Sequence, residues 1–268
     1  PMHDRTLAQR NAQHHFHPWT NNRQLAEAGA TIITRAHGIE VFDEQGRRYL
    51  DGMAGLWCVA LGYGDERLAK AAYEQMRALS YYNLFLKTSN RPALELAERL
   101  ADLAPAGLTR VLFGSTGSDA IESAIRIVRQ FWRESGKPEK RIIIGRDLAY
   151  HGSTMGSSSV GGLASMHEPL GLPLPGFEHV PTPYWFRDGG ALTPEAFGRQ
   201  AALALEAKIL ALGPGRVAAF FGEPVQGGGG AIFPPESYWP EISRICRQYD
   251  VLLVADEVIT AYGRTGHW

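Results

Sequence analysis

The sequence predicts an α/β fold in which a mostly parallel central sheet is covered by helices on both faces, together with an antiparallel meander near the N-terminus. Two observations carry this prediction. Apolar runs without polar alternation, such as RVAAFFG (216–222) and VLLVAD (251–256), are typical of strands that are buried on both faces. Longer segments with apolar residues at helical spacing separate these runs, and strands that alternate with helices are typical of parallel sheets.

The composition is that of a globular protein without a strongly charged surface. The chain has 268 residues, which suffice for one large or two modest domains, with 27 basic and 28 acidic side chains. The balanced charge argues against a nucleic-acid partner. Cys58 and Cys246 are too few and too far apart for a disulfide scaffold or a zinc site. No stretch approaches the ~20 apolar residues of a membrane span, so we expect a cytoplasmic protein without membrane contact.

The N-terminal quarter precedes the alternating pattern. Residues 1–30 are polar and predicted to be irregular, and their histidines, at positions 14, 15 and 17, fit no metal-ligand spacing. Short alternating runs over 31–50, broken by Gly38 and the turn DEQG, predict the antiparallel meander. The glycine-rich apolar stretch MAGLWCVALGYG is then expected to connect two domains. We therefore predict an N-terminal segment with part of a small domain over 1–57 and a large domain over 58–268.

The large domain is predicted to alternate helices and strands. Helices are expected over 65–80, 91–103, 118–134, 194–212 and 235–249, and strands over 109–113, 141–145, 216–222 and 251–256. The last strand is the most apolar, and no helix follows to cover it. Because a buried parallel strand needs a crossover on each side, we expect the sheet to continue in a longer polypeptide beyond Trp268.

The segment FGSTGSDA (113–120) joins a predicted strand to a long helix. Free N–H groups and the helix dipole at such a junction suit a phosphate; Gly117 lets the backbone come close, and Thr116 and Ser118 add hydroxyls. The alternative is that Ser118 is an ordinary N-cap and Gly117 a turn residue. The motifs of P-loop and dinucleotide-binding folds and the serine-hydrolase elbow are missing, which leaves a lone phosphate on a small cofactor.

Further reactive side chains follow other predicted strands. Asp256 ends VLLVA, Glu223 follows RVAAFFG, and the pair Tyr150-His151 follows RIIIG. Ligands of open parallel sheets bind outside the carboxyl ends of the strands, so we expect these groups in one crevice. Tyr150 could stack on a planar ring. Asp256 could pair with a protonated ring nitrogen, bind a metal or act as a base, or simply end a strand at a loop.

With these residues in place, the sequence resembles the N-terminal part of a class III (omega) aminotransferase, whose large domain has the type I fold of pyridoxal 5′-phosphate (PLP) enzymes. The matching stretches run from about His14 to Trp268: HPWT, DGMAGLWCVALGYG, YYNLF, FGSTGSDAIESAIR, YHGST, EPVQGGGG and VLLVADEVITAYGRTG. LWC, YYNLF and PTPYWF are similar, more narrowly, to enzymes that move amino groups from putrescine, other polyamines or omega-amino acids to pyruvate.

The resemblance implies PLP as the cofactor and no metal. It assigns the phosphate to the turn at 116–118 and the ring nitrogen to Asp256, which would keep that nitrogen protonated. The remaining implied cofactor residues are Tyr150 and Val258 on the two ring faces, His151, and Glu223 as a supporting acid. The implied amine pocket consists of Trp19, Leu56, Trp57, Phe85 and Tyr150. Apart from the resemblance, Trp57 and Phe85 would be interpreted as core residues.

PLP aminotransferases need a lysine as covalent anchor and proton shuttle. The chain contains Lys70, Lys87, Lys137, Lys140 and Lys208, none of which follows a strand within a cleft motif. The resemblance implies that this lysine, and an arginine for the substrate carboxylate, lie past Trp268.

We therefore expect the N-terminal part of a homodimeric enzyme that transfers an amino group from an omega-amine to pyruvate by a ping-pong mechanism. The segment YYNLF (81–85) is implied to lie at the subunit interface. One alternative is another PLP reaction on the same scaffold, such as that of an aminomutase or a decarboxylase. The other is a non-catalytic cofactor-binding fragment.

Overall fold

The computed structural model describes residues 6–268 and divides into two compact units, Pro1–Glu95 and Leu96–Trp268. The domain boundary that the sequence suggests, between residues 57 and 58, stays a prediction. No helix within the described range is both long and apolar enough to cross a lipid bilayer.

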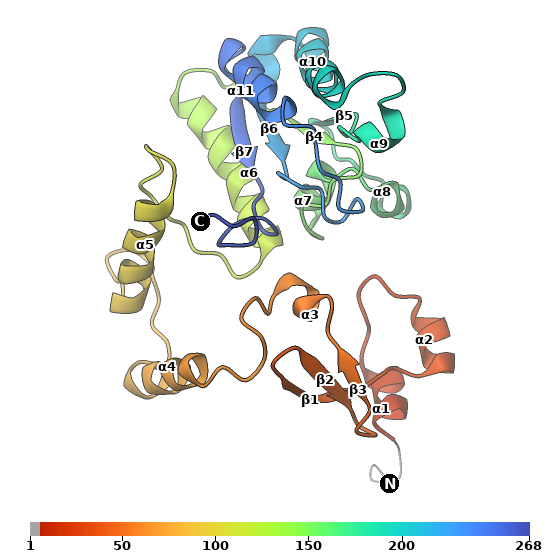
Figure 1. Ribbon diagram of the computed structural model, residues 1–268. Helices are drawn as coiled ribbons and strands as arrows, with labels where there is room; N and C mark the ends of the chain where they lie inside the picture. The colour runs from red at the N-terminus through yellow and green to blue at the C-terminus, as the bar shows by residue number, and fades with distance from the viewer. Residues whose placement is uncertain (1–5) are drawn as a thin grey trace. The chain divides into compact units, whose positions relative to one another are not determined.

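A three-stranded antiparallel sheet forms the centre of the first unit. Its strands are β1 (Ile33–His37), β2 (Glu40–Asp43) and β3 (Arg48–Leu50), which pair in chain order (Figure 1). Gly38 turns the chain between β1 and β2 with a φ of 59°, a conformation that glycine adopts without strain. The meander predicted over 31–50 is confirmed.

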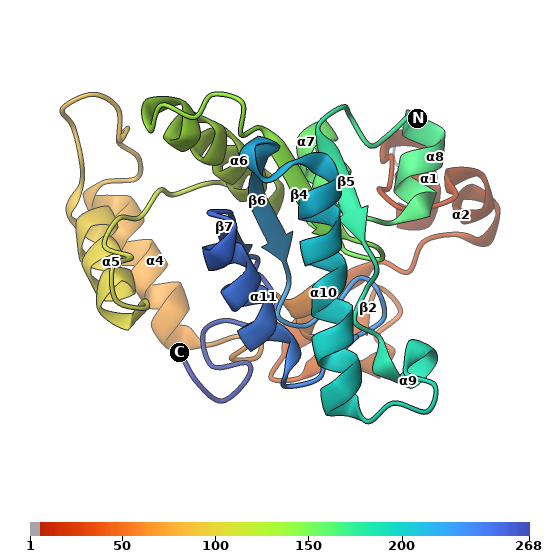
Figure 2. The ribbon, with the colours of Figure 1, turned by 90° about the horizontal axis from the view of Figure 1, so that it is seen from above.

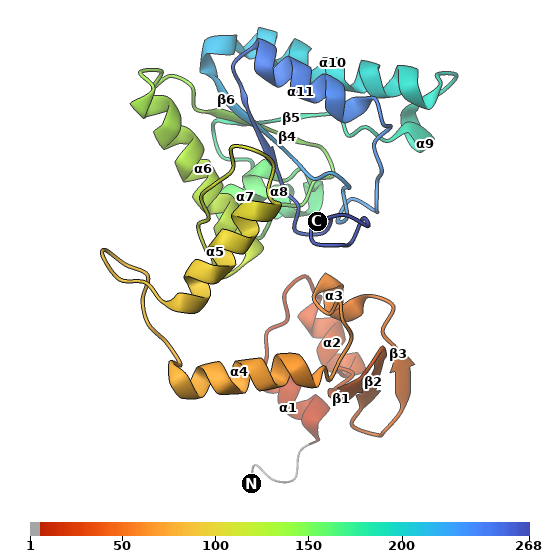
Figure 3. The ribbon, with the colours of Figure 1, turned by 60° about the vertical axis from the view of Figure 1, so that its left-hand side comes forward.

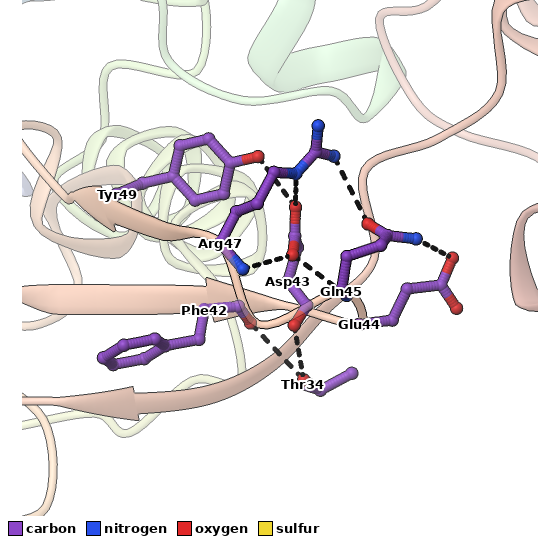
Figure 4. A network of polar contacts seen from close by, with 7 residues as sticks. All are labelled: Thr34, Phe42, Asp43, Glu44, Gln45, Arg47 and Tyr49. Atoms are coloured by element: carbon purple, nitrogen blue, oxygen red, sulfur yellow. Dashed lines mark hydrogen bonds and ion pairs between the residues drawn. The ribbon is translucent and has the colours of Figure 1, made fainter.

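Asp43 holds the second turn of this meander together (Figure 4). Its Oδ1 accepts the N–H groups of Gln45 (3.0 Å) and Arg47 (2.9 Å), and its Oδ2 accepts Nε of Arg47 (2.6 Å) and the hydroxyl of Tyr49 (2.8 Å). Burial would raise the pKa of Asp43, but the hydrogen bonds from Tyr49 and Arg47 outweigh burial and lower it. The turn is thus built around one ionised carboxylate.

Short polar helices precede the sheet. They are α1 (Leu7–His14) and α2 (Asn22–Ala28), so the irregular structure predicted over 1–30 is wrong at these positions, while residues 1–5 lie outside the described range. Both helices begin at capping side chains: Thr6 accepts the N–H of Gln9 in a capping box, and Asn21 caps α2. Because neither helix buries a residue, hydrophobic periodicity gave no signal for them.

Three further helices follow the meander. They are α3 (Ala54–Trp57), α4 (Glu66–Ala78) and α5 (Arg91–Leu103), the last of which extends across the boundary of the two units. The helices predicted over 65–80 and 91–103 are confirmed as α4 and α5.

The second unit contains a four-stranded parallel sheet in the order β5-β4-β6-β7 (Figure 1 and Figure 2). The strands are β4 (Ile142–Arg146), β5 (Phe177–Val180), β6 (Val217–Gly222) and β7 (Leu252–Ala255). The predicted parallel sheet is confirmed. The strand predicted over 109–113 is wrong: no described strand pairs with it, and an apolar sequence alone provides no hydrogen-bonding partner.

Helices cover both faces of this sheet (Figure 3). One layer consists of α10 (Pro194–Leu212) and α11 (Tyr238–Gln248), the other of α6 (Gly117–Glu134) and α7 (Met155–Val160). Side chains of the strands alternate between the layers: Ile144 packs with α10 and α11, and Ile143 packs with α6. The helices predicted over 118–134, 194–212 and 235–249 are confirmed. Shorter helices complete the unit: α8 (Ala164–Leu170), α9 (Trp185–Asp188) and η1 (Pro214–Arg216).

A buried ammonium group joins the amino ends of the strands. Nζ of Lys140 donates to the carbonyl oxygens of Val217 (2.9 Å) and Asp250 (2.6 Å), and lies 4.4 Å from the ring centroid of Trp132. Two further carbonyls, of Pro214 and Tyr249, lie at 3.2 and 3.5 Å. Burial lowers the pKa of Lys140. This one side chain therefore satisfies carbonyls at the starts of both β6 and β7.

We predict that Lys140→Met lowers the free energy of unfolding by about 2–4 kcal/mol, because it leaves several carbonyls without a donor. Chemical denaturation measures the change. Lys208→Met is the control, since its half-exposed ammonium only pairs with Glu178 at 3.2 Å; we expect a loss below about 1 kcal/mol. Equal losses in the two variants would contradict the role given to Lys140.

Candidate functional site

The segments that leave the carboxyl ends of β4, β6 and β7 meet in the second unit. Asp256, directly after β7, donates its N–H to the carbonyl of Gly222 at the end of β6 (3.0 Å). Nδ1 of His151 lies 2.7 Å from Oδ2 of Asp256. The N–H of Tyr150 donates to Oε1 of Glu223 at 3.1 Å. The structure thus brings together the groups that the sequence placed at neighbouring strand ends.

Asp256 is held in one orientation. The side chains of His151 and Asp256 are 0% and 7% exposed, and Oδ1 of Asp256 accepts the N–H of Val258 at 3.2 Å. A carboxylate can only accept, so the proton of this pair lies on Nδ1 of His151. Phe221 packs edge-on against the imidazole at a centroid distance of 6.4 Å. The carboxylate therefore has a fixed position in a largely dry environment.

Glu223 joins the loops after β4 and β6. In addition to the N–H of Tyr150, it accepts the N–H of Gly227 on Oε2 at 3.1 Å. Burial raises the pKa of Glu223, which is 4% exposed. The fully buried guanidinium of Arg146 donates to the backbone carbonyl of Glu223. These contacts fit the supporting role predicted for this acid.

The turn before α6 has its own cap. Oγ1 of Thr116 accepts the N–H of Asp119 at 3.1 Å, so Thr116 is the N-cap and the alternative in which Ser118 caps the helix is wrong. Ser118 lies in the first turn, where its Oγ accepts the N–H of Ser153 at 3.0 Å. That bond uses a lone pair of Ser118 and leaves its proton able to donate. The start of α6 is therefore suited to bind an anion.

The start of α6 lies close to the loops after β4 and β7. A Cβ added to Gly117 would lie 3.5 Å from Cγ2 of Val258, and one added to Gly152 would lie 2.5 Å from Oγ of Ser118. Gly152 has a φ of 134° and follows His151, which binds Asp256. These short contacts place the anion-binding turn and the carboxylate in one small region, so a single small molecule can reach both.

The other predicted site residues fall into two groups. Tyr150 and Val258 lie in the second unit with side chains partly or largely exposed, where they can contact a ring. The predicted substrate residues Trp19, Leu56, Trp57 and Phe85 are exposed residues of the first unit. That these four residues line an amine pocket stays a prediction.

Sequence reasoning missed Glu122, one helical turn after Ser118. Its Oε1 accepts the N–H groups of Gly156 (2.9 Å) and Ser157 (3.2 Å) at the start of α7. Two acceptors on one helix face therefore hold the loop that follows His151. The spacing of Ser118 and Glu122 along α6 could have pointed to this shared face.

The lysines of the second unit lie away from Asp256. Lys140 contacts the starts of β6 and β7, the opposite edge of the sheet, and Lys137 pairs with Asp250 near the same edge. Lys208 extends from α10 to Glu178. In the described part of this unit, no lysine is placed to act as the covalent anchor. Nor do residues 6–268 contain a group of three or more His, Cys, Asp or Glu side chains that could hold a metal ion.

The fold is that of the PLP-dependent transferases. The family model for class-III aminotransferases matches residues 23–268, so the chain belongs to the class-III aminotransferase family. This confirms the resemblance, and PLP is the cofactor of this family. The site fits that cofactor: an anion-binding turn bounded by Gly117 and Gly152, where a Cβ would approach its neighbours, lies near a buried carboxylate of fixed orientation.

The chain is similar over nearly all its length to several known proteins. It is 49% identical to the putrescine–pyruvate aminotransferase of Pseudomonas aeruginosa, over 95% of this chain and 56% of that protein. Its structure matches the omega transaminase of Pseudomonas jessenii in complex with PMP with a TM-score of 0.95 and 44% identity, over 97% of this chain and 58% of that one.

A thermostable omega transaminase variant with a tryptophan replaced by glycine, engineered for synthesis of bulky amines, matches with a TM-score of 0.96 and 45% identity, over 98% and 59%. The chain thus spans somewhat more than half the length of these relatives.

We predict that His151→Leu weakens PLP binding about tenfold, because Asp256 loses the bond that orients it, whereas His151→Asn retains a donor and loses less. Equilibrium titration of the full-length protein with PLP measures the dissociation constants. His167→Leu is the control, since His167 contacts the carbonyl of Ser158 and not Asp256. Wild-type affinity in His151→Leu would contradict the role of this hydrogen bond.

The raised pKa of Glu223 predicts a pH dependence of stability. Its folded pKa lies above the usual value of 4.5, so folding favours the protonated form. The contribution of Glu223 is therefore most favourable below that value and is lost as pH rises through the raised pKa. We expect Glu223→Gln to gain stability relative to the wild type as pH rises from 4.5, as measured by denaturation across pH.

Glu241→Gln provides a control of opposite sign. The hydrogen bond from Arg244 lowers the pKa of Glu241, so the carboxylate stabilises the fold above the usual pKa. This variant should lose stability relative to the wild type as pH rises. The same trend in both variants would contradict the assignment.

Proposed function

We propose that this chain is the cofactor-binding N-terminal part of an aminotransferase that moves an amino group from an omega-amine to pyruvate by a ping-pong mechanism. Putrescine and related diamines are the first candidate donors. The observation that carries the proposal is the buried carboxylate of Asp256, held by His151 beside the anion-binding start of α6. The 49% identity to a putrescine–pyruvate aminotransferase supports the choice of substrates.

In this proposal the residues of the second unit bind and orient the cofactor. When bound, PLP supplies an electron sink for the charge that develops as the amine carbon loses a proton. Asp256 holds the proton on the ring nitrogen, and His151 keeps the carboxylate aligned for that bond. The N–H groups of Gly117 and Ser118 bind the phosphate at the positive end of α6. Tyr150 and Val258 restrict the tilt of the ring.

The covalent lysine and a subunit partner complete the proposal. The resemblance implies that this lysine lies past Trp268, and the lysines of the second unit, which contact other groups than Asp256, support that part of the proposal. The chain covers only 56% of its putrescine–pyruvate relative, which leaves room for such a segment. A cytoplasmic homodimer, with YYNLF at its interface, belongs to the proposal on the strength of the resemblance.

The amine pocket is proposed to have apolar walls from Trp19, Leu56, Trp57 and Phe85. Such walls suit the methylene chain of a diamine and exclude water from it. The solved relative in which a tryptophan was exchanged for glycine was engineered for bulky amines, which supports a tryptophan as a size-limiting wall. In this chain Trp57 is the proposed counterpart.

The test uses purified full-length protein with PLP, putrescine and pyruvate, and measures alanine. Alanine that forms only with both substrates supports the proposal. Release of carbon dioxide from an amino acid, or migration of an amino group within one substrate, would instead establish the decarboxylase or the aminomutase alternative. Full-length protein that binds PLP and turns over no amine would establish a non-catalytic binding protein.

We predict that Trp57→Gly raises kcat/KM for a bulky aromatic amine about tenfold relative to putrescine, because it removes the largest proposed wall. Initial rates with the two donors at saturating pyruvate give this ratio. Phe233→Ala, which removes an exposed aromatic side chain of the second unit outside the proposed pocket, should leave the ratio unchanged. An unchanged ratio in Trp57→Gly would remove Trp57 from the pocket.

A further inference from the structure

The short element α3 (Ala54–Trp57) is a single left-handed turn, unlike the helices α4 and α5 that follow it. The φ angles of Ala54, Gly55, Leu56 and Trp57 are 46°, 60°, 59° and 64°. This conformation is unfavourable for every residue with a Cβ, and three of the four residues have one. Leu56 and Trp57 are 61% and 40% exposed, so burial of their side chains within the unit does not offset the strain.

The carboxylate of Asp51 holds this turn. Oδ2 of Asp51 accepts the N–H of Gly55 at 2.7 Å and the hydroxyl of Tyr63 at 2.6 Å, and Oδ1 accepts the N–H of Met53 at 3.2 Å. A Cβ at Gly55 would lie 2.7 Å from Cγ2 of Val59 and 3.0 Å from Oη of Tyr63. The turn is therefore closely packed against Val59 and Tyr63.

Asp51 and Tyr63 are themselves fixed to the meander. The N–H of Asp51 donates to the carbonyl of Ile39 at 2.9 Å, and Tyr63 exchanges two backbone hydrogen bonds with Gly38, of 2.9 and 2.7 Å. The hydrogen bond from Tyr63 lowers the pKa of Asp51, and the same bond raises the pKa of Tyr63. The strained turn thus lies between two residues, Asp51 and Tyr63, that are both hydrogen-bonded to the meander.

We propose that Asp51 and Tyr63 are positioning residues that hold the left-handed turn and thereby set the direction in which Leu56 and Trp57 face the amine substrate. This inference rests on the proposed function, in which those two side chains form part of the amine pocket. Neither Asp51 nor Tyr63 touches substrate or cofactor in it. Without their hydrogen bond the turn relaxes from its strained conformation, and the two apolar side chains move with the backbone.

The same sheet contains a matched control. Tyr49 donates its hydroxyl to Oδ2 of Asp43 at 2.8 Å, an Asp–Tyr pair of the same chemistry at the other turn of the meander. In that turn only Gly46 has a positive φ. Removal of the Tyr49 hydroxyl therefore costs a comparable bond without releasing a strained segment.

The experiment compares Tyr63→Phe and Tyr49→Phe in the full-length, PLP-loaded protein. For each variant we measure kcat and KM with putrescine and with a bulky aromatic amine, the PLP content and the thermal midpoint. Tyr63→Phe should raise KM for putrescine about three- to tenfold and change the ratio of the two donors, with PLP content unchanged. Tyr49→Phe should leave that ratio at the wild-type value.

Two further variants test the inference in case Tyr63→Phe folds poorly. Asp51→Asn keeps one acceptor oxygen and should shift the donor ratio in the same direction as Tyr63→Phe. Ala54→Gly, added to Tyr63→Phe, should recover part of the loss, because glycine adopts the left-handed conformation without strain.

A donor ratio that stays at the wild-type value in both Tyr63→Phe and Asp51→Asn would overturn the inference. If Trp57→Gly changes the ratio in the same experiments, the proposed function stands and only the role of Asp51 and Tyr63 falls. A wild-type protein that makes no alanine would instead overturn the proposed function itself.

Discussion

The parallel pairing of β6 with both β4 and β7 is the constraint on which the rest of the second unit depends. Because the three strands run in the same direction, the residues that follow them lie at the same end of the sheet. His151, Glu223 and Asp256 come within five residues of their strand ends and meet there. The helices bury β4 and β6, while β7 stays partly exposed. The side chains of His151, Glu223 and Asp256 are nevertheless almost fully buried, so their hydrogen bonds form with little access of water. Site and sheet are thus consequences of one pairing pattern.

Much of the fold can be predicted from local sequence. The strands for which the prediction is wrong or missing have a common cause. β6 and β7 were predictable because continuous apolar residues leave few other interpretations. The sequence does not predict β5, because the polar residues Glu178 and His179 interrupt its apolar run. An outer strand of the sheet tolerates these residues, since both are only half-buried. The apolar run at 109–113 gave a false strand, since pairing depends on a partner that no local pattern reveals. Local patterns report burial, and pairing is a property of the whole sheet.

The site divides in the same way. The convergence of Asp256 and Glu223 could be predicted because both residues end strands of one parallel sheet. The contacts of Glu122 and Arg146 could not, because they depend on which helix face meets which loop and on a charge buried within a strand. Motif resemblance identified the family but gave no indication that Asp51 would hold a strained turn. Such contacts are visible only once the backbone conformation is known.

The carbonyl oxygens that surround Nζ of Lys140 resemble a cation-binding site. Convergent main-chain oxygens are the ligands with which proteins bind alkali-metal ions, and here a covalently attached ammonium occupies that position. The polypeptide thereby supplies a cation of its own to these oxygens. The carbonyl oxygens at the starts of β6 and β7 therefore find their donor within the polypeptide itself.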